Sequence, residues 1–146
     1  MWPHDNALIG AGFRRYGLVA EAERLFASLL EAALDFEHQR LPECFAGYAR
    51  AEYGTPVRYT VACHPQAWAA GATLHLLETC LGLEPNAFER RLRIVEPRLP
   101  PFVSDVELKD LRVGNGRAHV RFVRAEDGDV RVDVLSVDGE LEVEVP

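Results

Sequence analysis

The spacing of apolar residues changes once along the chain, and this change restricts the possible fold more than any other feature. Before Glu84, apolar residues recur at three- and four-residue intervals or fill whole segments, which is typical of α-helices. After Asn86, valine and leucine alternate with charged residues, which is typical of β-strands with one buried face. The sequence therefore predicts an α+β protein, with helices in residues 1–84 and an antiparallel β extension in residues 85–146.

Three helices are expected in the first part, over Asn6 to Tyr16, Val19 to Phe36 and Pro65 to Leu81. The first and third are apolar or small on nearly every side, whereas the second has one polar side. A helix that is apolar all round is normally buried in a larger structure, so we expect two inner helices and one outer helix. Gly10, Gly12 and Gly71 each weaken a helix by up to about 1 kcal/mol, and close backbone packing is the expected reason for them.

The connection over residues 37–64 is long for a compact domain, and such loops are usually either functional or disordered. Disorder is not expected, because this segment is rich in aromatic and aliphatic residues. They are Leu41, Phe45, Tyr48, Tyr53, Val57, Tyr59 and Val61. We interpret the segment as an ordered loop that forms part of a site.

The second part is expected to be an antiparallel meander with one dry face. The predicted strands are Leu92 to Val95, Val106 to Val113, Arg117 to Arg124, Val130 to Val137 and Glu140 to Val145. Glycine-containing turns separate several of them, at Gly114-Asn115-Gly116, Asp127-Gly128 and Asp138-Gly139. The alternation slips near Asp110, which predicts a β-bulge there. No residue of this part has a pattern typical of catalysis.

Composition limits the classes of partner. The net charge of −7 and the lack of a Lys/Arg cluster argue against nucleic acid and against an anionic membrane surface. No apolar segment is long enough for a membrane helix, and no secretion signal is recognisable, so a cytoplasmic protein is expected. The 3 cysteines form no C-x-x-C pair, and a metal site built from Cys63, His64 and His75 is disfavoured against a structural role. Neither a metal nor a cofactor is expected.

The N-terminal segment concentrates polar and aromatic chemistry. Trp2, His4, Asp5 and Asn6 stand directly before an apolar run, where a helix start would direct them to one place. One interpretation is structural, since either Asp5 or Asn6 could be the N-cap of that helix. The other is a sugar site, because hydroxyls need converging donors and acceptors while the C–H face of a pyranose packs on an aromatic ring.

Three segments together resemble a known family. They are Trp-Pro-His-Asp-Asn-Ala-Leu-Ile at 2–9, Leu-Pro-Glu-x-Phe-x-Gly at 41–47 and Val-Ala-Cys-x-Pro-Gln-Ala-Trp-Ala-Ala-Gly-Ala at 61–72. In this order they resemble the C-terminal part of bacterial glycogen-debranching proteins, the amylo-alpha-1,6-glucosidase-like members of the six-hairpin glycoside hydrolases. The resemblance implies a partial α/α toroid of helical hairpins, followed by the β extension.

The resemblance also implies roles for individual residues. Glu43 matches the segment that carries the general base in these hydrolases, which act on α-glucosidic bonds by inversion. Trp2, His4 and Asp5 resemble wall residues that hold the cleaved glucosyl unit, with Asn6 beside them and Asp5 as a secondary candidate for a catalytic carboxylate. Gln66 and Trp68 begin the third helix and are expected to reach the pocket, although an inner-helix packing role is an equal alternative for Trp68.

Two features differ from the family. Cys44 and His64 stand where an aliphatic and a small residue are expected, so packing around Glu43 is expected to differ. Glycoside hydrolysis needs two carboxyl groups, and no segment here matches the upstream hairpin that supplies the general acid. Together with the position of Met1 directly before the first motif, this predicts a C-terminal fragment that is inactive alone.

Two functions therefore remain open. The first is the C-terminal part of an α-glucosidic glycoside hydrolase, which binds an α-glucan or oligosaccharide and associates with the upstream part of the enzyme, or with itself through exposed inner helices. The alternative is a non-catalytic module of helices and strands that binds a partner protein or a glucan. The missing acid favours the alternative for the chain as it stands.

Overall fold

The computed structural model describes residues 1–146. It contains four α-helices and three small sheets, which confirms the α+β class in its general form. The chain divides into two compact units, Met1–Thr79 and Cys80–Pro146. The first unit is mainly helical and the second is made of strands, whereas the sequence placed this change between residues 84 and 85. None of the helices is long and apolar enough to cross a membrane.

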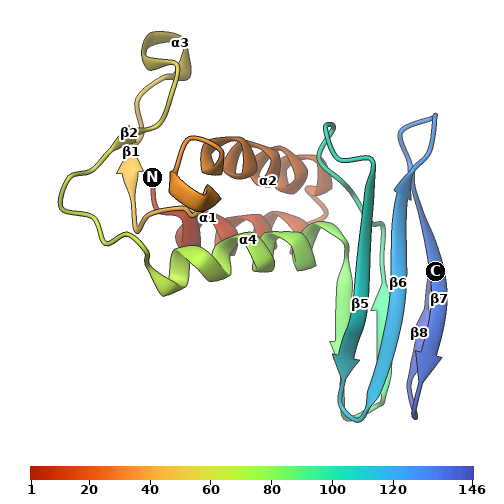
Figure 1. Ribbon diagram of the computed structural model, residues 1–146. Helices are drawn as coiled ribbons and strands as arrows, with labels where there is room; N and C mark the ends of the chain where they lie inside the picture. Colours follow the sequence, from red (N-terminus) through yellow and green to blue (C-terminus); the bar gives the residue numbers. More distant parts are fainter. The chain divides into compact units, whose positions relative to one another are not determined.

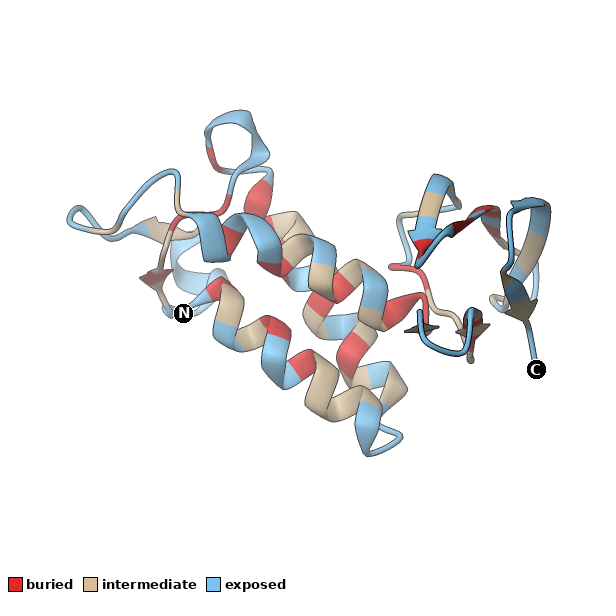
Figure 2. Cartoon of the chain, turned by 90° about the horizontal axis from the view of Figure 1, so that it is seen from below, coloured by how far each residue is buried: buried red, intermediate tan, exposed pale blue.

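The three long helices of the first unit are α1 (Pro3–Arg15), α2 (Val19–Ala33) and α4 (Ala67–Cys80). They lie side by side in Figure 1, and Figure 2 shows their buried residues on the sides that face one another. Apolar side chains such as Phe26, Leu29 and Leu76 are almost fully buried. All three predicted helices are present, and their ends are shifted by a few residues.

Gly10 marks the point where these helices meet. A Cβ atom there would lie 2.7 Å from Leu76 Cδ2 and 3.5 Å from Leu25 Cδ2, so α2 and α4 both approach α1 at this glycine. The expected close packing is therefore confirmed at Gly10. It is wrong for Gly12 and Gly71 within this chain, because a Cβ at either position would meet nothing within 4 Å.

The start of α1 also differs from the prediction. The N-cap residue is Trp2, without a side-chain cap, and Asp5 and Asn6 already lie within the first turns. Neither is therefore the N-cap that the structural interpretation required. The reason is Pro3, whose fixed φ and missing N–H suit the first position of a helix.

The segment over residues 37–64 contains four short elements. They are the 3₁₀ turn η1 (Glu37–Gln39), β1 (Phe45–Ala46), α3 (Arg50–Tyr53) and β2 (Val57–Arg58). β1 and β2 pair antiparallel, with Phe45 opposite Arg58. The N-terminal ammonium donates a hydrogen bond to Phe45 O at 2.8 Å, and Phe45 N–H donates to Met1 O at 3.0 Å. The chain start is thereby held against β1.

The second unit has two three-stranded sheets instead of one meander. One sheet has the order β3 (Leu83–Asn86), β4 (Arg91–Ile94) and β8 (Glu142–Glu144). The other has the order β5 (Asp105–Val113), β6 (Gly116–Arg124) and β7 (Val130–Asp138). β8 pairs parallel with β4, so the wholly antiparallel prediction is wrong at this strand. β3 was not predicted.

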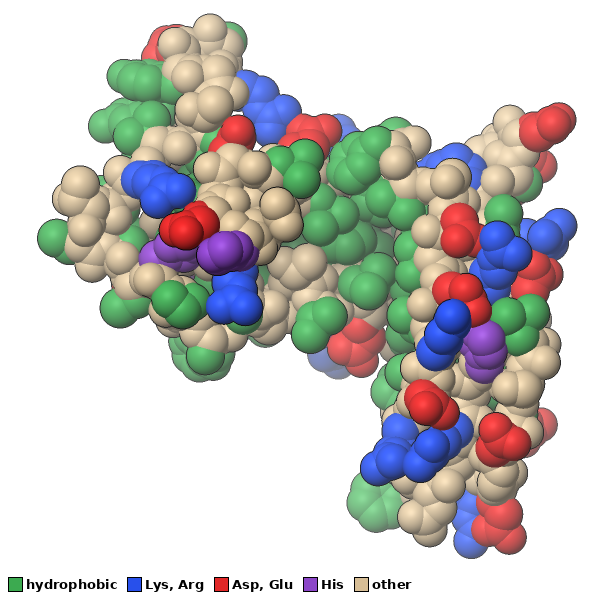
Figure 3. Space-filling view, viewed as in Figure 1, with side chains coloured by type: hydrophobic (Ala, Val, Ile, Leu, Met, Phe, Trp, Pro, Cys, Tyr) green, Lys and Arg blue, Asp and Glu red, His purple; other side chains and the backbone are tan.

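Within the second sheet, the register shifts between Leu108 and Leu111, and Asp110 has a φ of 56°. The predicted bulge is confirmed. Val120 and Phe122 of β6 are fully buried, whereas Arg121 between them is charged and exposed. Figure 3 shows acidic and basic side chains interleaved along this sheet, as expected for a solvated face. Such exposed ion pairs contribute little to stability individually.

Candidate functional site

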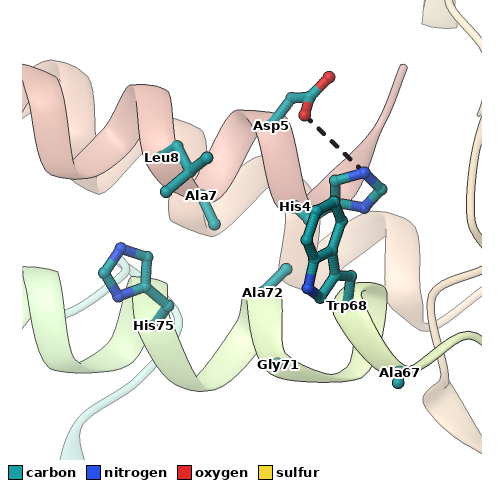
Figure 4. Close-up of a pocket in the computed structure, with 9 residues that line it drawn as sticks. All are labelled: His4, Asp5, Ala7, Leu8, Ala67, Trp68, Gly71, Ala72 and His75. Carbon is teal, nitrogen blue, oxygen red and sulfur yellow. Dashed lines mark ion pairs between the residues drawn. The ribbon is translucent and has the colours of Figure 1, made fainter.

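A groove of about 440 Å³ lies between α1 and α4 in the helical unit. Four residues of α1 and five of α4 line it, namely His4, Asp5, Ala7, Leu8, Ala67, Trp68, Gly71, Ala72 and His75. Figure 4 shows His4, Trp68 and His75 between the two helices, whereas the carboxylate of Asp5 points away from α4. The spacing of the lining residues follows the helix period, since residues three, four and seven positions apart lie on one side of a helix.

His4 lies at one end of this groove and contacts both tryptophans of the chain. Its ring lies 5.6 Å from the ring of Trp2, edge to face, and 5.0 Å from the ring of Trp68. Its side chain is only 13% exposed, and its Nδ1 atom is buried without a hydrogen-bond partner. Trp68 is 70% exposed, so most of its indole is open to solvent beside His4.

Asp5 is the only carboxylate in the groove lining. Its Oδ1 lies 3.8 Å from His4 Nε2, the contact drawn dashed in Figure 4, and 60% of its side chain is exposed. An exposed carboxylate beside an imidazole and an indole can accept hydrogen bonds from hydroxyl groups while the rings pack against an apolar face. This arrangement suits a neutral polar ligand such as a sugar.

Asn6 and Gln66 do not line the groove, and their side chains serve the ends of helices. Asn6 Nδ2 donates to Trp2 O at 2.8 Å. Gln66 Oε1 accepts from Ala69 N–H at 2.7 Å, which satisfies one of the free amides at the start of α4. Asn6 therefore stabilises the backbone at Trp2, and Gln66 stabilises the first turn of the helix that contains Trp68.

Glu43 also lies outside the groove lining. Its backbone N–H donates to Cys63 O at 2.9 Å, and its Oε2 accepts from Cys63 N–H at 3.0 Å. The neighbouring strand β1 is hydrogen-bonded to Met1, next to Trp2, and Cys63 lies shortly before α4, which carries Trp68. Glu43 is therefore connected to the two segments that carry these tryptophans. No hydrogen bond joins Glu43 to His4 or Asp5.

His75 was considered only as a metal ligand, yet it lines the groove and its Nδ1 lies 3.6 Å from Glu78 Oε2. The sequence contained the signal for this position, because His75 follows Trp68 by two helical turns and therefore shares its side of α4. No group of three or more His, Cys, Asp or Glu side chains in the chain is arranged to hold a metal ion.

Comparison with known protein families finds none that matches this chain, and comparison with curated proteins finds no similar protein.

Proposed function

We propose that this chain is the C-terminal part of a glycoside hydrolase of the glycogen-debranching type, acting on α-glucosidic linkages. One observation carries the proposal: the imidazole of His4 contacts both tryptophans and shares a groove with a single exposed carboxylate. In this proposal Trp2, His4, Asp5 and Trp68 bind the glucosyl unit. Aromatic faces and hydroxyl-binding groups at one place are what a sugar requires.

Glu43 is the proposed general base. Its Oε2 accepts the Cys63 N–H, which fixes the carboxylate and leaves Oε1 available to a water molecule. Inverting hydrolysis needs two carboxyl groups about 6.5–9.5 Å apart. No segment of this chain resembles the hairpin that carries the general acid, so the acid would come from another part of the enzyme. The chain by itself is then expected to bind sugar without turnover.

The fold proposed for the complete enzyme is an α/α toroid in which α1 and α4 are inner helices. In this chain Leu8 and Leu74 are 65% and 69% exposed. Helices of neighbouring hairpins would cover these side chains, as the apolar character of α1 and α4 requires. The same exposure favours the second candidate, a non-catalytic module whose groove binds a partner protein or a glucan.

Intrinsic fluorescence gives a direct test, because the 2 tryptophans of the chain are Trp2 and Trp68 and both contact His4. Adding linear or branched malto-oligosaccharides should change the tryptophan emission in a saturable way. His4→Ala and Asp5→Asn should weaken this binding, whereas Asp35→Asn, an exposed carboxylate at the end of α2, should not. No saturable change with any α-glucan would contradict sugar binding.

The catalytic part needs its own experiment. With the acid-bearing segment joined to this chain, the enzyme should hydrolyse α-glucans, and Glu43→Gln should lower kcat by several orders of magnitude without weakening sugar binding. Full activity of Glu43→Gln would reject Glu43 as the base. Sugar binding without any hydrolysis by the joined protein would favour the non-catalytic module.

A further inference from the structure

A further cavity, of about 250 Å³, is lined mainly by residues of the 37–64 segment, which also contains Glu43. Pro42 and Ala62 are part of its lining, and the residues that follow them, Glu43 and Cys63, are joined by hydrogen bonds. The other lining side chains belong to Phe36, Arg58, Tyr59, Thr60 and His64. This cavity is separate from the groove between α1 and α4, since the two share no lining residue.

Arg58 is held in this cavity by an aromatic ring. It stands opposite Phe45 in the β1–β2 pair, and its guanidinium carbon lies 5.4 Å from the ring centre of Phe36. The ring centres of Phe36 and Phe45 are 5.7 Å apart, so the guanidinium lies over one of two packed aromatic rings. A guanidinium stacked on a ring keeps its N–H donors free around its edge.

No acid neutralises this arginine. Arg58 has no hydrogen bond or ion pair in the structure, and the cavity lining contains no carboxylate. Many other arginines do have acidic partners, for example Arg50 with Glu31 at 2.6 Å and Arg93 with Glu84 at 2.9 Å. An unpaired, preorganised guanidinium is notable in a chain with a net charge of −7.

Three other polar side chains, those of Tyr59, Thr60 and His64, line the cavity together with Arg58. His64 Nε2 lies 3.0 Å from Arg40 O, and because a carbonyl only accepts, Nε2 must carry the proton of that bond. The other ring nitrogen, Nδ1, then carries a lone pair in the neutral ring and can only accept a hydrogen bond, so it is not a donor to an anion. Tyr59 and Thr60 add hydroxyl groups to the lining. Figure 3 shows basic, acidic and histidine side chains next to one another on the visible face of the helical unit.

We propose that this cavity binds a small oxyanion, with Arg58 as its main ligand and the hydroxyl groups of Tyr59 and Thr60 as further contacts. Two N–H groups along the guanidinium edge can donate in parallel to two oxygen atoms of a phosphate or carboxylate group. Charge-assisted hydrogen bonds of this kind are stronger than neutral ones. The cavity volume suits a small anion, or the anionic end of a larger molecule. The site would act independently of sugar binding in the groove, and its existence does not rest on the proposed glycosidase function.

The test is a titration of the full chain, labelled with ¹⁵N, at constant ionic strength maintained with chloride. Inorganic phosphate and acetate are added separately, because they represent the two classes of oxyanion. At least one of them should cause saturable shifts in the backbone amides of Arg58, Tyr59, Thr60 and His64. Arg58→Gln should weaken this binding by about tenfold or more, as expected for the loss of a charged hydrogen-bond donor.

Two further variants keep the result interpretable. Arg58→Lys retains the charge without the planar fork, so it should bind more weakly than the native chain and more strongly than Arg58→Gln. Arg24→Gln removes an exposed arginine of α2 outside the cavity and should bind as the native chain does. Shifts that grow linearly for both anions, or equal affinity in Arg58→Gln and the native chain, would overturn the proposal. Neither result would bear on malto-oligosaccharide binding by the tryptophan groove.

Discussion

Glu43 and Cys63 are joined by two hydrogen bonds, one from the backbone of Glu43 and one to its side chain. Glu43 N–H donates to Cys63 O at 2.9 Å, and Glu43 Oε2 accepts from Cys63 N–H at 3.0 Å. This pair connects the loop after α2 to the segment that leads into α4. Any catalytic use of Glu43 therefore depends on a carboxylate that also has a structural role.

The structural role gives the first prediction. Glu43→Ala removes the acceptor of the Cys63 N–H and should destabilise the unit by about 1 kcal/mol, whereas Glu43→Gln retains an acceptor oxygen and should cost less. Amide hydrogen exchange is the suitable measurement, because Cys63 N–H should exchange faster in Glu43→Ala than in Glu43→Gln. Equal exchange at Cys63 in both variants would contradict the hydrogen bond.

The second prediction concerns the helix contact at Gly10. Gly10→Ala should destabilise the chain by about 1 kcal/mol despite the better helix propensity of alanine, because the new Cβ would lie 2.7 Å from the buried Leu76 Cδ2. Gly12→Ala is the matched control in the same helix. It meets nothing within 4 Å and should stabilise by about 0.5–1 kcal/mol. Urea denaturation of both variants would show opposite shifts of the midpoint, and stabilisation by Gly10→Ala would refute the packing at this position.

The sequence predicted the helices well because each depends on local spacing. The same spacing predicts that Trp68 and His75 share one side of α4, as the groove lining shows. Helix ends were less accurate. Pro3 allows α1 to begin before Asp5, so the helix starts without the polar N-cap that its sequence predicts.

Pairing between distant segments could not be predicted in the same way. β3 includes Pro85, at the predicted boundary between the helices and the strands, where the short segment has no alternating pattern of its own. β8 pairs parallel with β4, and nothing in a short alternating segment specifies its neighbour or its direction. Glu43 illustrates the same limit within the candidate site, because its position depends on contacts of Met1 with Phe45 and of Cys63 with Glu43 itself.

The third prediction is a loss of sheet stability in acid. The hydrogen bond from His119 to Glu107, with 2.5 Å between Nε2 and Oε1, lowers the pKa of Glu107, and the charge of nearby Lys109 acts in the same direction. A carboxyl group whose pKa is lowered by folding contributes stability above its unfolded pKa. That stability is lost as the pH falls through the lower folded value.

Thermal unfolding of the native chain should therefore show a decrease in Tm below about pH 4, and Glu107→Gln should make this decrease shallower. Glu126→Gln provides the control, since Glu126 is an exposed carboxylate in a turn of the same unit without an ion pair. The decrease of Tm with falling pH should therefore be shallower for Glu107→Gln than for Glu126→Gln. If both followed the native curve, Glu107 would not contribute to acid sensitivity.

The last prediction concerns the exposed apolar side of the groove. Leu8 lines the groove and is 65% exposed, so the isolated chain should self-associate through this surface when no other protein covers it. Burying a leucine contributes about 1.5–3 kcal/mol, so Leu8→Gln should raise the dissociation constant of the self-associated form by about tenfold or more. Leu34→Gln is a matched control, because Leu34 is similarly exposed, at 71%, but lies at the end of α2 away from the groove lining. Sedimentation velocity over a range of concentrations would measure both. Equal weakening by the two substitutions would indicate non-specific association, whereas weakening by Leu8→Gln alone would assign the contact to the face between α1 and α4.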